Sequence, residues 1–179
     1  MIARIALPGG HLSREVAANM LEQLRNAHED RSIRVILIDA PGATMFCSGG
    51  DPDIATEAFE FHTWAAKPIV CAVQGAVLGP GLAIVANCHV VVAAQGTSFG
   101  LTEVRTGHFP IGMRAIANAI GQRRALELAL TGRVFGTPEA LQMGLIHEMA
   151  PPFEYDDRAE ATATHLAGLN LEGRLPLIW

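Results

Sequence analysis

Two glycine-rich turns are the parts of this sequence best suited to chemistry. Ser48-Gly49-Gly50-Asp51 and Gly79-Pro80-Gly81 each follow an apolar segment and lead toward a predicted helix. Backbone N–H groups at such turns point outward and can stabilise an anion. A dinucleotide fingerprint would need a third glycine where Ile84 stands, so the second turn is a weak match to a nucleotide site.

Glu103 and His108 are titratable residues in a glycine-containing stretch and are candidates for one site. The alternative interpretation of His108 is an ordinary loop histidine. Histidines elsewhere are scattered without the spacing of metal ligands, so we predict no metal site. They are His11, His28, His62, His89, His147 and His165.

Two nucleophilic side chains have a second, simpler interpretation. Gly96-Thr97-Ser98-Phe99-Gly100 matches G-x-S-x-G, the turn that presents a serine nucleophile in α/β-hydrolases. The residues that follow are poor helix formers, so a turn serine is favoured and a serine hydrolase using Ser98 is a lesser alternative. Cys47 beside Ser48 is either a reactive thiol near backbone amides or, as we favour, a small buried residue.

Helical and extended patterns alternate along the chain, which predicts an α/β fold with a largely parallel sheet. The predicted strands are 34–39, 69–73 and 90–94. The predicted helices are 13–27 with Ser13 as N-cap, 61–65, 82–87, 122–130, a short one with Thr137 as N-cap that closes at Gly144, and 157–166.

The composition is typical of a compact globular protein rather than of a disordered chain. Its 179 residues are 50% hydrophobic and 17% charged, with a formal net charge of -5 that argues against a nucleic-acid partner. Three cysteines without CxxC spacing predict neither disulfides nor zinc. The start lacks a secretory signal, and polar residues and Gly79-Pro80-Gly81 interrupt the apolar stretch 69–94. We therefore expect a cytoplasmic protein without a membrane span.

Three segments in order resemble the signatures of the crotonase, or enoyl-CoA hydratase/isomerase, family. They are Phe46-Cys47-Ser48-Gly49-Gly50-Asp51, the run 67–81 (KPIVCAVQGAVLGPG), and Ser98-Phe99-Gly100-Leu101-Thr102-Glu103. Leu130-Thr131-Gly132 and Gly144-Leu145-Ile146 resemble later landmarks of the family, so the likeness covers about residues 3–151.

The resemblance implies a crotonase-like spiral of ββα units, in a short version lacking much of the C-terminal helical region. Residues 1–150 would form the core, and 151–179 a short helix and an apolar tail. It also implies a homo-oligomer, trimer or hexamer, and an acyl-CoA or acyl-carrier thioester as substrate, with no further cofactor. The apolar tail 175–179 is itself a reason to expect self-association.

The resemblance also implies where an oxyanion would be held. Carried over by motif, the first backbone donor is the N–H of Gly50, and the second position falls on Pro80, which has no N–H. The N–H of Gly81 is the alternative second donor.

Only one of the two glutamates that the family's hydratases use is present. The first position is Ala83 and the second is Glu103, a pattern that resembles the isomerase branch, where one carboxylate moves a proton between two carbons. Burial would raise the pKa of Glu103 toward that of a useful base, whereas the alternative is a surface glutamate paired with Arg105. Asp51 and His108 are additional candidates.

We therefore expect an enzyme of the enoyl-CoA isomerase/hydratase type, closer to an isomerase than to a hydratase. Glu103 would be its acid/base. The alternative is a catalytically degraded member of the family that binds an acyl group or a partner. Pro80, Ala83 and the short C-terminal region motivate that alternative.

Overall fold

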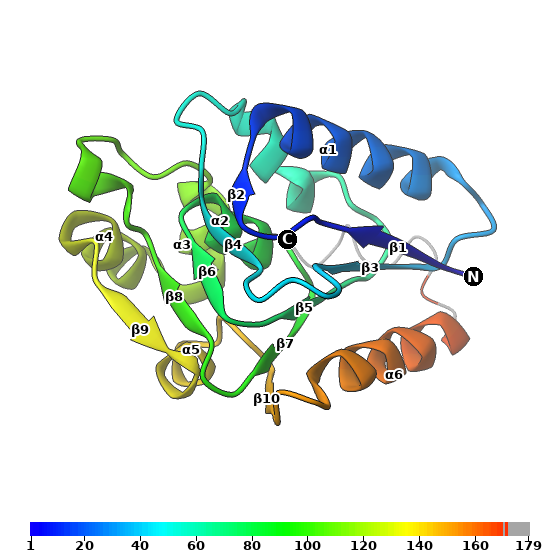
Figure 1. Cartoon of the computed structure of the whole chain (residues 1–179). Helices are drawn as coiled ribbons and strands as arrows, with labels where there is room; N and C mark the ends of the chain where they lie inside the picture. Colours follow the sequence, from blue (N-terminus) through cyan, green and yellow to red (C-terminus); the bar gives the residue numbers. More distant parts are fainter. Residues whose placement is uncertain (170, 172–179) are drawn as a thin grey trace.

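The computed structural model describes residues 1–169 and 171, and it contains two five-stranded sheets (Figure 1). The first has the order β1-β3-β5-β7-β10 and the second β2-β4-β6-β8-β9. Every strand pairing recorded in the described residues is parallel except that of β8 with β9, so the predicted parallel arrangement is confirmed. The strands are β1 (Ile2–Ala6), β2 (His11–Leu12), β3 (Val35–Asp39), β4 (Cys47–Gly50), β5 (Ile69–Val73), β6 (Ala76–Leu78), β7 (Val90–Ala94), β8 (Ser98–Gly100), β9 (Val134–Gly136) and β10 (Glu148–Ala150).

Helices pack against both sheets (Figure 1). The α-helices are α1 (Arg14–Glu29), α2 (Pro80–Ala86), α3 (Met113–Ile120), α4 (Gln122–Thr131), α5 (Thr137–Met143) and α6 (Tyr155–Gly168). Three 3-10 helices complete the described elements: η1 (Thr56–Phe59), η2 (Phe61–Thr63) and η3 (Glu103–Thr106).

The first sheet is buried on both faces. All five residues of β3 and of β5 are buried, as expected for parallel strands with helices on each side. Ile36 and Ile38 join the large core that α1 and α2 also line, whereas Val35 and Leu37 join a smaller cluster under α6. The helix α6 packs on β3, β5 and β7, while the expected boundary at residue 150 stays a prediction.

The chain passes repeatedly from the first sheet to the second, and this alternation positions the site. Strands β1, β3, β5 and β7 lie in the first sheet, and each is followed by a strand of the second. In the second sheet, Ser48 pairs with Leu78 and Leu78 with Gly100. The carboxyl ends of β4, β6 and β8 are therefore neighbours, although they are far apart in the sequence.

Local signals predicted several elements correctly. Ser13 caps α1 by accepting a hydrogen bond from the Val16 N–H at 3.2 Å, and the strands 69–73 and 90–94 have the predicted bounds. The helix predicted over 82–87 begins two residues earlier, at Pro80. A proline fits the first turn of a helix because its missing N–H would have no partner there.

Two local predictions are wrong. Residues 61–65 do not form a regular helix, because the buried Phe59 and Phe61 are held in consecutive 3-10 turns against α2. Thr137 is not an N-cap but the first residue of α5. Its buried hydroxyl donates to the Thr97 carbonyl oxygen at 3.1 Å, so a distant contact replaces the local cap.

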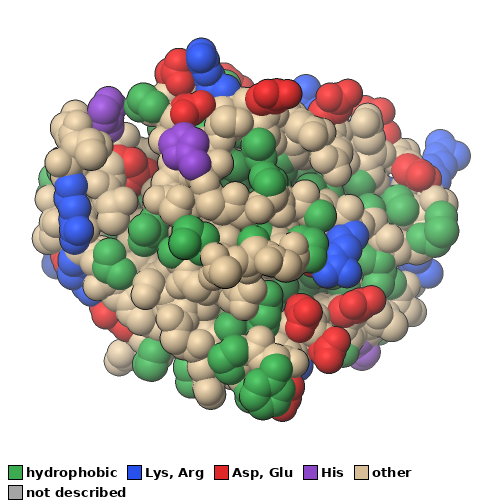
Figure 2. Space-filling view, viewed as in Figure 1, with side chains coloured by type: hydrophobic (Ala, Val, Ile, Leu, Met, Phe, Trp, Pro, Cys, Tyr) green, Lys and Arg blue, Asp and Glu red, His purple; other side chains and the backbone are tan. Residues whose placement is uncertain are grey.

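The surface carries mixed charge. On the face seen in Figure 2, acidic and basic side chains are interspersed rather than gathered into one basic region. Among the described helices, none combines the length and the apolar character needed to cross a bilayer. The apolar tail 175–179 lies outside the described residues.

Candidate active site

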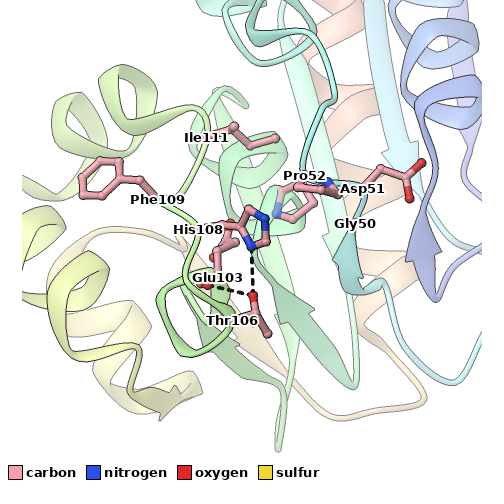
Figure 3. A pocket seen from close by; sticks show the side chains of 9 residues that line it. Gly50, Asp51, Pro52, Glu103, Thr106, His108, Phe109 and Ile111 are labelled. Atoms are coloured by element: carbon pink, nitrogen blue, oxygen red, sulfur yellow. Dashed lines mark hydrogen bonds between the residues drawn. The ribbon is translucent and has the colours of Figure 1, made fainter.

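A cavity of about 120 Å³ lies at the neighbouring ends of β4, β6 and β8. Segments from three parts of the chain meet there, and Figure 3 shows Glu103, His108 and Ile111 on one side and Gly50 with Asp51 on the other. The lining residues are Gly50, Asp51, Pro52, Pro80, Glu103, Thr106, His108, Phe109 and Ile111. The fold therefore brings together both glycine turns and the predicted acid/base residue.

Gly50 and Pro80 touch across the wall of this cavity. A β-carbon on Gly50 would lie 2.6 Å from Pro80 Cγ and 2.8 Å from the Leu12 carbonyl oxygen, so glycine is the residue that fits. Pro80 is the first residue of α2 and is buried. At this point the ring of Pro80 forms the cavity wall, and proline has no backbone N–H to donate.

The carboxyl group of Glu103 is buried at the base of the cavity. Neither of its oxygens is exposed or has a hydrogen-bond partner in the described part of the chain. A β-carbon on Gly79 would lie 3.1 Å from Glu103 Oε1, so the carboxyl group packs closely against the turn before α2. Burial raises the pKa of Glu103, because the charged form loses its hydration. Among the described ion pairs none joins Glu103 to Arg105.

Glu103 also holds His108 in place through its backbone. The Glu103 carbonyl oxygen accepts hydrogen bonds from the His108 N–H at 3.1 Å and from the Thr106 hydroxyl at 2.9 Å. Gly107, with φ of 79°, makes the left-handed turn that brings His108 back toward Glu103. His108 Nδ1 lies 3.3 Å from Thr106 Oγ1, as the dashed lines in Figure 3 show.

Asp51 lines the cavity, but its carboxylate is engaged elsewhere. One oxygen lies 2.8 Å from His11 Nε2, and the other accepts the Arg14 N–H at 3.0 Å. The hydrogen bond from His11 is the main reason that the pKa of Asp51 is lowered. Asp51 therefore ties the loop after β4 to the start of α1.

Gly81 is buried and is absent from the cavity lining. A β-carbon there would lie 2.4 Å from Cys47 Cβ, so the residue packs against β4. Burial raises the pKa of the Cys47 thiol, and the backbone amide of Gly81 partly opposes this rise. The Gly81 N–H therefore lies beside the Cys47 sulfur atom.

Comparison with known proteins agrees with this arrangement. The family model for enoyl-CoA hydratase/isomerase matches residues 8–171. The chain belongs to the enoyl-CoA hydratase/isomerase family. The (E)-benzylidenesuccinyl-CoA hydratase of Thauera aromatica is 30% identical over 172 residues, which are 87% of this chain and 67% of that relative.

Solved structures of the enoyl-CoA hydratase/isomerase family have the same fold. A family protein from Silicibacter pomeroyi matches with a TM-score of 0.87 at 26% identity, covering 98% of this chain and 82% of that one. A protein titled enoyl-CoA hydratase/carnithine racemase, from Magnetospirillum magneticum, matches with a TM-score of 0.80 at 29% identity, covering 95% and 73%. The expected crotonase-like α/β fold is therefore confirmed.

Ala83 stands where the resemblance places the first glutamate of the family's hydratases, and its surroundings are full. Ala83 is fully buried in α2, and a β-carbon on Gly112 would lie 2.5 Å from Ala83 Cβ. The loop 109–112 thus lies directly on the helix at this point. A glutamate at position 83 would require this loop to move.

The nucleophiles considered from sequence lie outside the cavity. Ser98 is not a turn residue: it belongs to β8 and pairs with Ala76 and Gly136, because the segment is held between two strands. It therefore lacks the strand-to-helix turn of a nucleophile elbow. Cys47 is buried and donates to the Gly49 carbonyl oxygen at 3.2 Å, which confirms the buried interpretation. Among the described residues, no group of three His, Cys, Asp or Glu side chains could hold a metal ion.

Sequence reasoning missed the lining residues Thr106, Phe109 and Ile111. The motif that carries the resemblance stops at Glu103; Thr106 ends η3, and Phe109 and Ile111 follow in a loop without a regular pattern. The apolar pair Phe109 and Ile111 next to His108 was the available signal. Only the folded position of the loop over α2 shows that these two side chains form an apolar wall of the cavity.

Proposed function

We propose that this protein moves a proton between carbons of an acyl thioester through an enolate, with Glu103 as the acid/base. The observation that carries the proposal is the buried, unpaired carboxyl group of Glu103 in a cavity that also contains Gly50. A raised pKa suits a carboxyl group that must accept a proton from carbon and return it.

The enolate oxygen would be held by the backbone N–H of Gly50. Pro80 supplies no second donor, and losing one such donor typically reduces transition-state stabilisation by about 2.7–4 kcal/mol. The enzyme we propose is consequently slower than one with two donors.

Isomerisation suits the single carboxyl group better than hydration does. Adding water needs one group to activate the oxygen and one to deliver the proton. Ala83 and the loop over it leave Glu103 without a second carboxylate at that place. Relatives are named as hydratases of CoA thioesters, so the substrate we propose is an acyl-CoA or the thioester of an acyl carrier.

Incubation with a panel of acyl- and enoyl-CoA thioesters in deuterated water tests this function. We expect deuterium uptake at carbon, with a double-bond shift in suitable enoyl substrates, and loss of both in Glu103→Gln. Glu22→Gln, an exposed glutamate of α1, is the matched control and should behave as wild type. Hydrated product in place of isomer would identify a hydratase.

A second candidate is a protein that binds thioesters without turning them over, and Pro80 in the oxyanion position favours it. Binding of a thioester without any uptake of deuterium would support this candidate over the enzyme. We further propose assembly as a trimer or hexamer, and a monomer by light scattering at working concentration would contradict it.

A further inference from the structure

The buried position of Glu103 raises a question of proton supply. A carboxyl group that takes a proton from carbon must exchange it with solvent before deuterium can be incorporated. Both oxygens of Glu103 have almost no exposed surface and no hydrogen-bond partner among the described residues. A group that reaches both the cavity and solvent would serve this exchange.

The hydrogen bonds of Thr106 determine which nitrogen of His108 carries a proton. A threonine hydroxyl has a single proton to donate, and that of Thr106 goes to the Glu103 carbonyl oxygen at 2.9 Å. Thr106 Oγ1 can then only accept from His108, whose Nδ1 lies 3.3 Å away. Nδ1 is accordingly the protonated nitrogen, and Nε2 of the neutral ring keeps its lone pair.

His108 connects the interior of the cavity with its exterior. It lines the same cavity as Glu103, and the residue itself is exposed. Its ring is held at Nδ1 by Thr106 and its backbone N–H by the Glu103 carbonyl oxygen. The cavity of about 120 Å³ that both side chains line also has room for a water molecule.

From this geometry, and on the basis of the proposed function, we infer that His108 relays protons between Glu103 and solvent. The O–H bond of the protonated Glu103 breaks and an N–H bond forms at His108 Nε2, directly or through one water. This leaves a carboxylate and an imidazolium. The imidazolium then gives its proton to bulk water and returns to the neutral ring, so protons and charge balance without another reactant.

Asp51, the other titratable side chain on the lining, is a poorer relay. Its oxygens already accept hydrogen bonds from His11 and from the Arg14 N–H. The hydrogen bond from His11 lowers the pKa of Asp51, so its carboxylate is a weak base for a proton held by Glu103.

The relay would decide between two fates of the proton that Glu103 removes. Either Glu103 returns that proton to another carbon of the same substrate, or His108 exchanges it with solvent. The ratio of solvent deuterium uptake to double-bond shift measures this partition. The ratio is independent of the amount of active enzyme, so it separates a relay from general damage to the site.

The test uses the full chain and an enoyl-CoA that wild type isomerises in deuterated water. In His108→Asn the ratio of deuterium uptake to isomerisation should fall about tenfold or more, whatever the rate of isomerisation. An α-deuterated substrate in ordinary water should correspondingly keep more of its label in the product. His165→Asn, an exposed histidine of α6, is the control and should leave the ratio unchanged.

Thr106 is tested as a positioning residue. Thr106→Val removes the hydroxyl that holds the His108 tautomer and should lower the same ratio, whereas Thr106→Ser should restore it. An unchanged ratio in both His108→Asn and His108→Gln would overturn the relay while leaving the proposed function intact. Isomerisation by wild type without any deuterium uptake would likewise overturn the relay alone, whereas absence of both uptake and double-bond shift with every thioester would overturn the relay and the proposed function.

Discussion

The buried polar side chains at the two ends of α2 differ in whether they are hydrogen-bonded. Before its first residue, the Glu103 carboxyl group packs against Gly79 with both oxygens unpaired. After its last residue, Asn87 Oδ1 lies 2.9 Å from the backbone nitrogen of His62 and 2.6 Å from its Nδ1. The Asn87 amide nitrogen donates to the carbonyl oxygens of Phe59 and Ala83, each at 2.8 Å.

On the proposed function, this difference separates a reactive end of α2, at Glu103, from a scaffold end, at Asn87. A fully satisfied buried network defines one arrangement of the chain, whereas an unpaired buried group is unfavourable for folding and is typical of a functional site. Asn87 holds the 3-10 segment around Phe59 and His62 on α2. On the proposed function, Glu103 keeps its hydrogen-bonding capacity for a substrate.

The largest expected effect is on activity, at the reactive end. Glu103→Gln should reduce deuterium exchange by about 10²–10⁴-fold, because the acid/base group is gone. The Glu103→Gln variant should lose activity without losing stability. Burial raises the pKa of Glu103, so ionisation disfavours the folded state increasingly as the pH rises above the unfolded-state pKa.

Urea unfolding of Glu103→Gln at pH 5 and pH 8 measures this effect. The variant should be at least as stable as wild type at pH 8 and should lose less stability between the two pH values. A variant that is both inactive and markedly less stable at pH 8 would show that Glu103 stabilises the fold, as we expect of Asn87.

A second change at the reactive end should increase activity. Pro80→Ala restores an N–H at the oxyanion position, and one such donor is worth about 10²–10³-fold in rate. Alanine is a good helix former, so the free energy of unfolding should change by less than about 1 kcal/mol. Pro138→Ala in the first turn of α5 is the matched control and should leave the rate unchanged. An unchanged rate in Pro80→Ala would show that this position does not face the reacting oxygen.

At the scaffold end, Asn87→Ala should act on stability. It leaves buried backbone groups of His62, Phe59 and Ala83 without their partner, and each such loss costs about 1–3 kcal/mol. We expect the free energy of unfolding to fall by about 3 kcal/mol or more. Asn118→Ala, an exposed residue of α3, should stay within about 0.5 kcal/mol of wild type. A small effect of Asn87→Ala would show that the hydrogen bonds of Asn87 do not stabilise the fold.

The last expected effect, absent at neutral pH, concerns the protonation of His89 at the same end of α2. Burial lowers the pKa of His89 to about 4, and His89 Nδ1 accepts the Ile69 N–H at 3.0 Å. The folded state thus favours the neutral ring, so stability is fully present above the unfolded-state pKa, near 6.5. Below it, stability should fall toward pH 4 with a slope of up to about 1.4 kcal/mol per pH unit from this group.

His147 acts in the same direction, because burial lowers its pKa and its Nδ1 accepts the Val91 N–H at 3.1 Å. Unfolding of wild type and of His89→Gln between pH 7 and pH 4 measures the contribution of His89. The variant should show the shallower slope. Equal slopes would mean that His89 is not the group that titrates.

Much of the scaffold was predictable from residues close together in the sequence. Ser13 predicts the start of α1, and the β-branched run in β7 predicts a buried strand. The hydroxyl of Thr137 shows the limit of such signals, because its partners are carbonyl oxygens of Ala94 and Thr97 rather than the start of its own helix.

The candidate site also combines local sequence patterns with features that depend on the tertiary structure. The motifs around Gly50, Pro80 and Glu103 are local patterns, and the sequence alone determined the family and the presence of one of the two glutamates that its hydratases use. Only the tertiary structure decided that Glu103 is buried without partners, that Gly81 faces Cys47 and that Gly112 covers Ala83. Caps, turns and strand propensities depend on neighbours along the chain. Burial and hydrogen-bond satisfaction depend on segments that meet only when both sheets have formed.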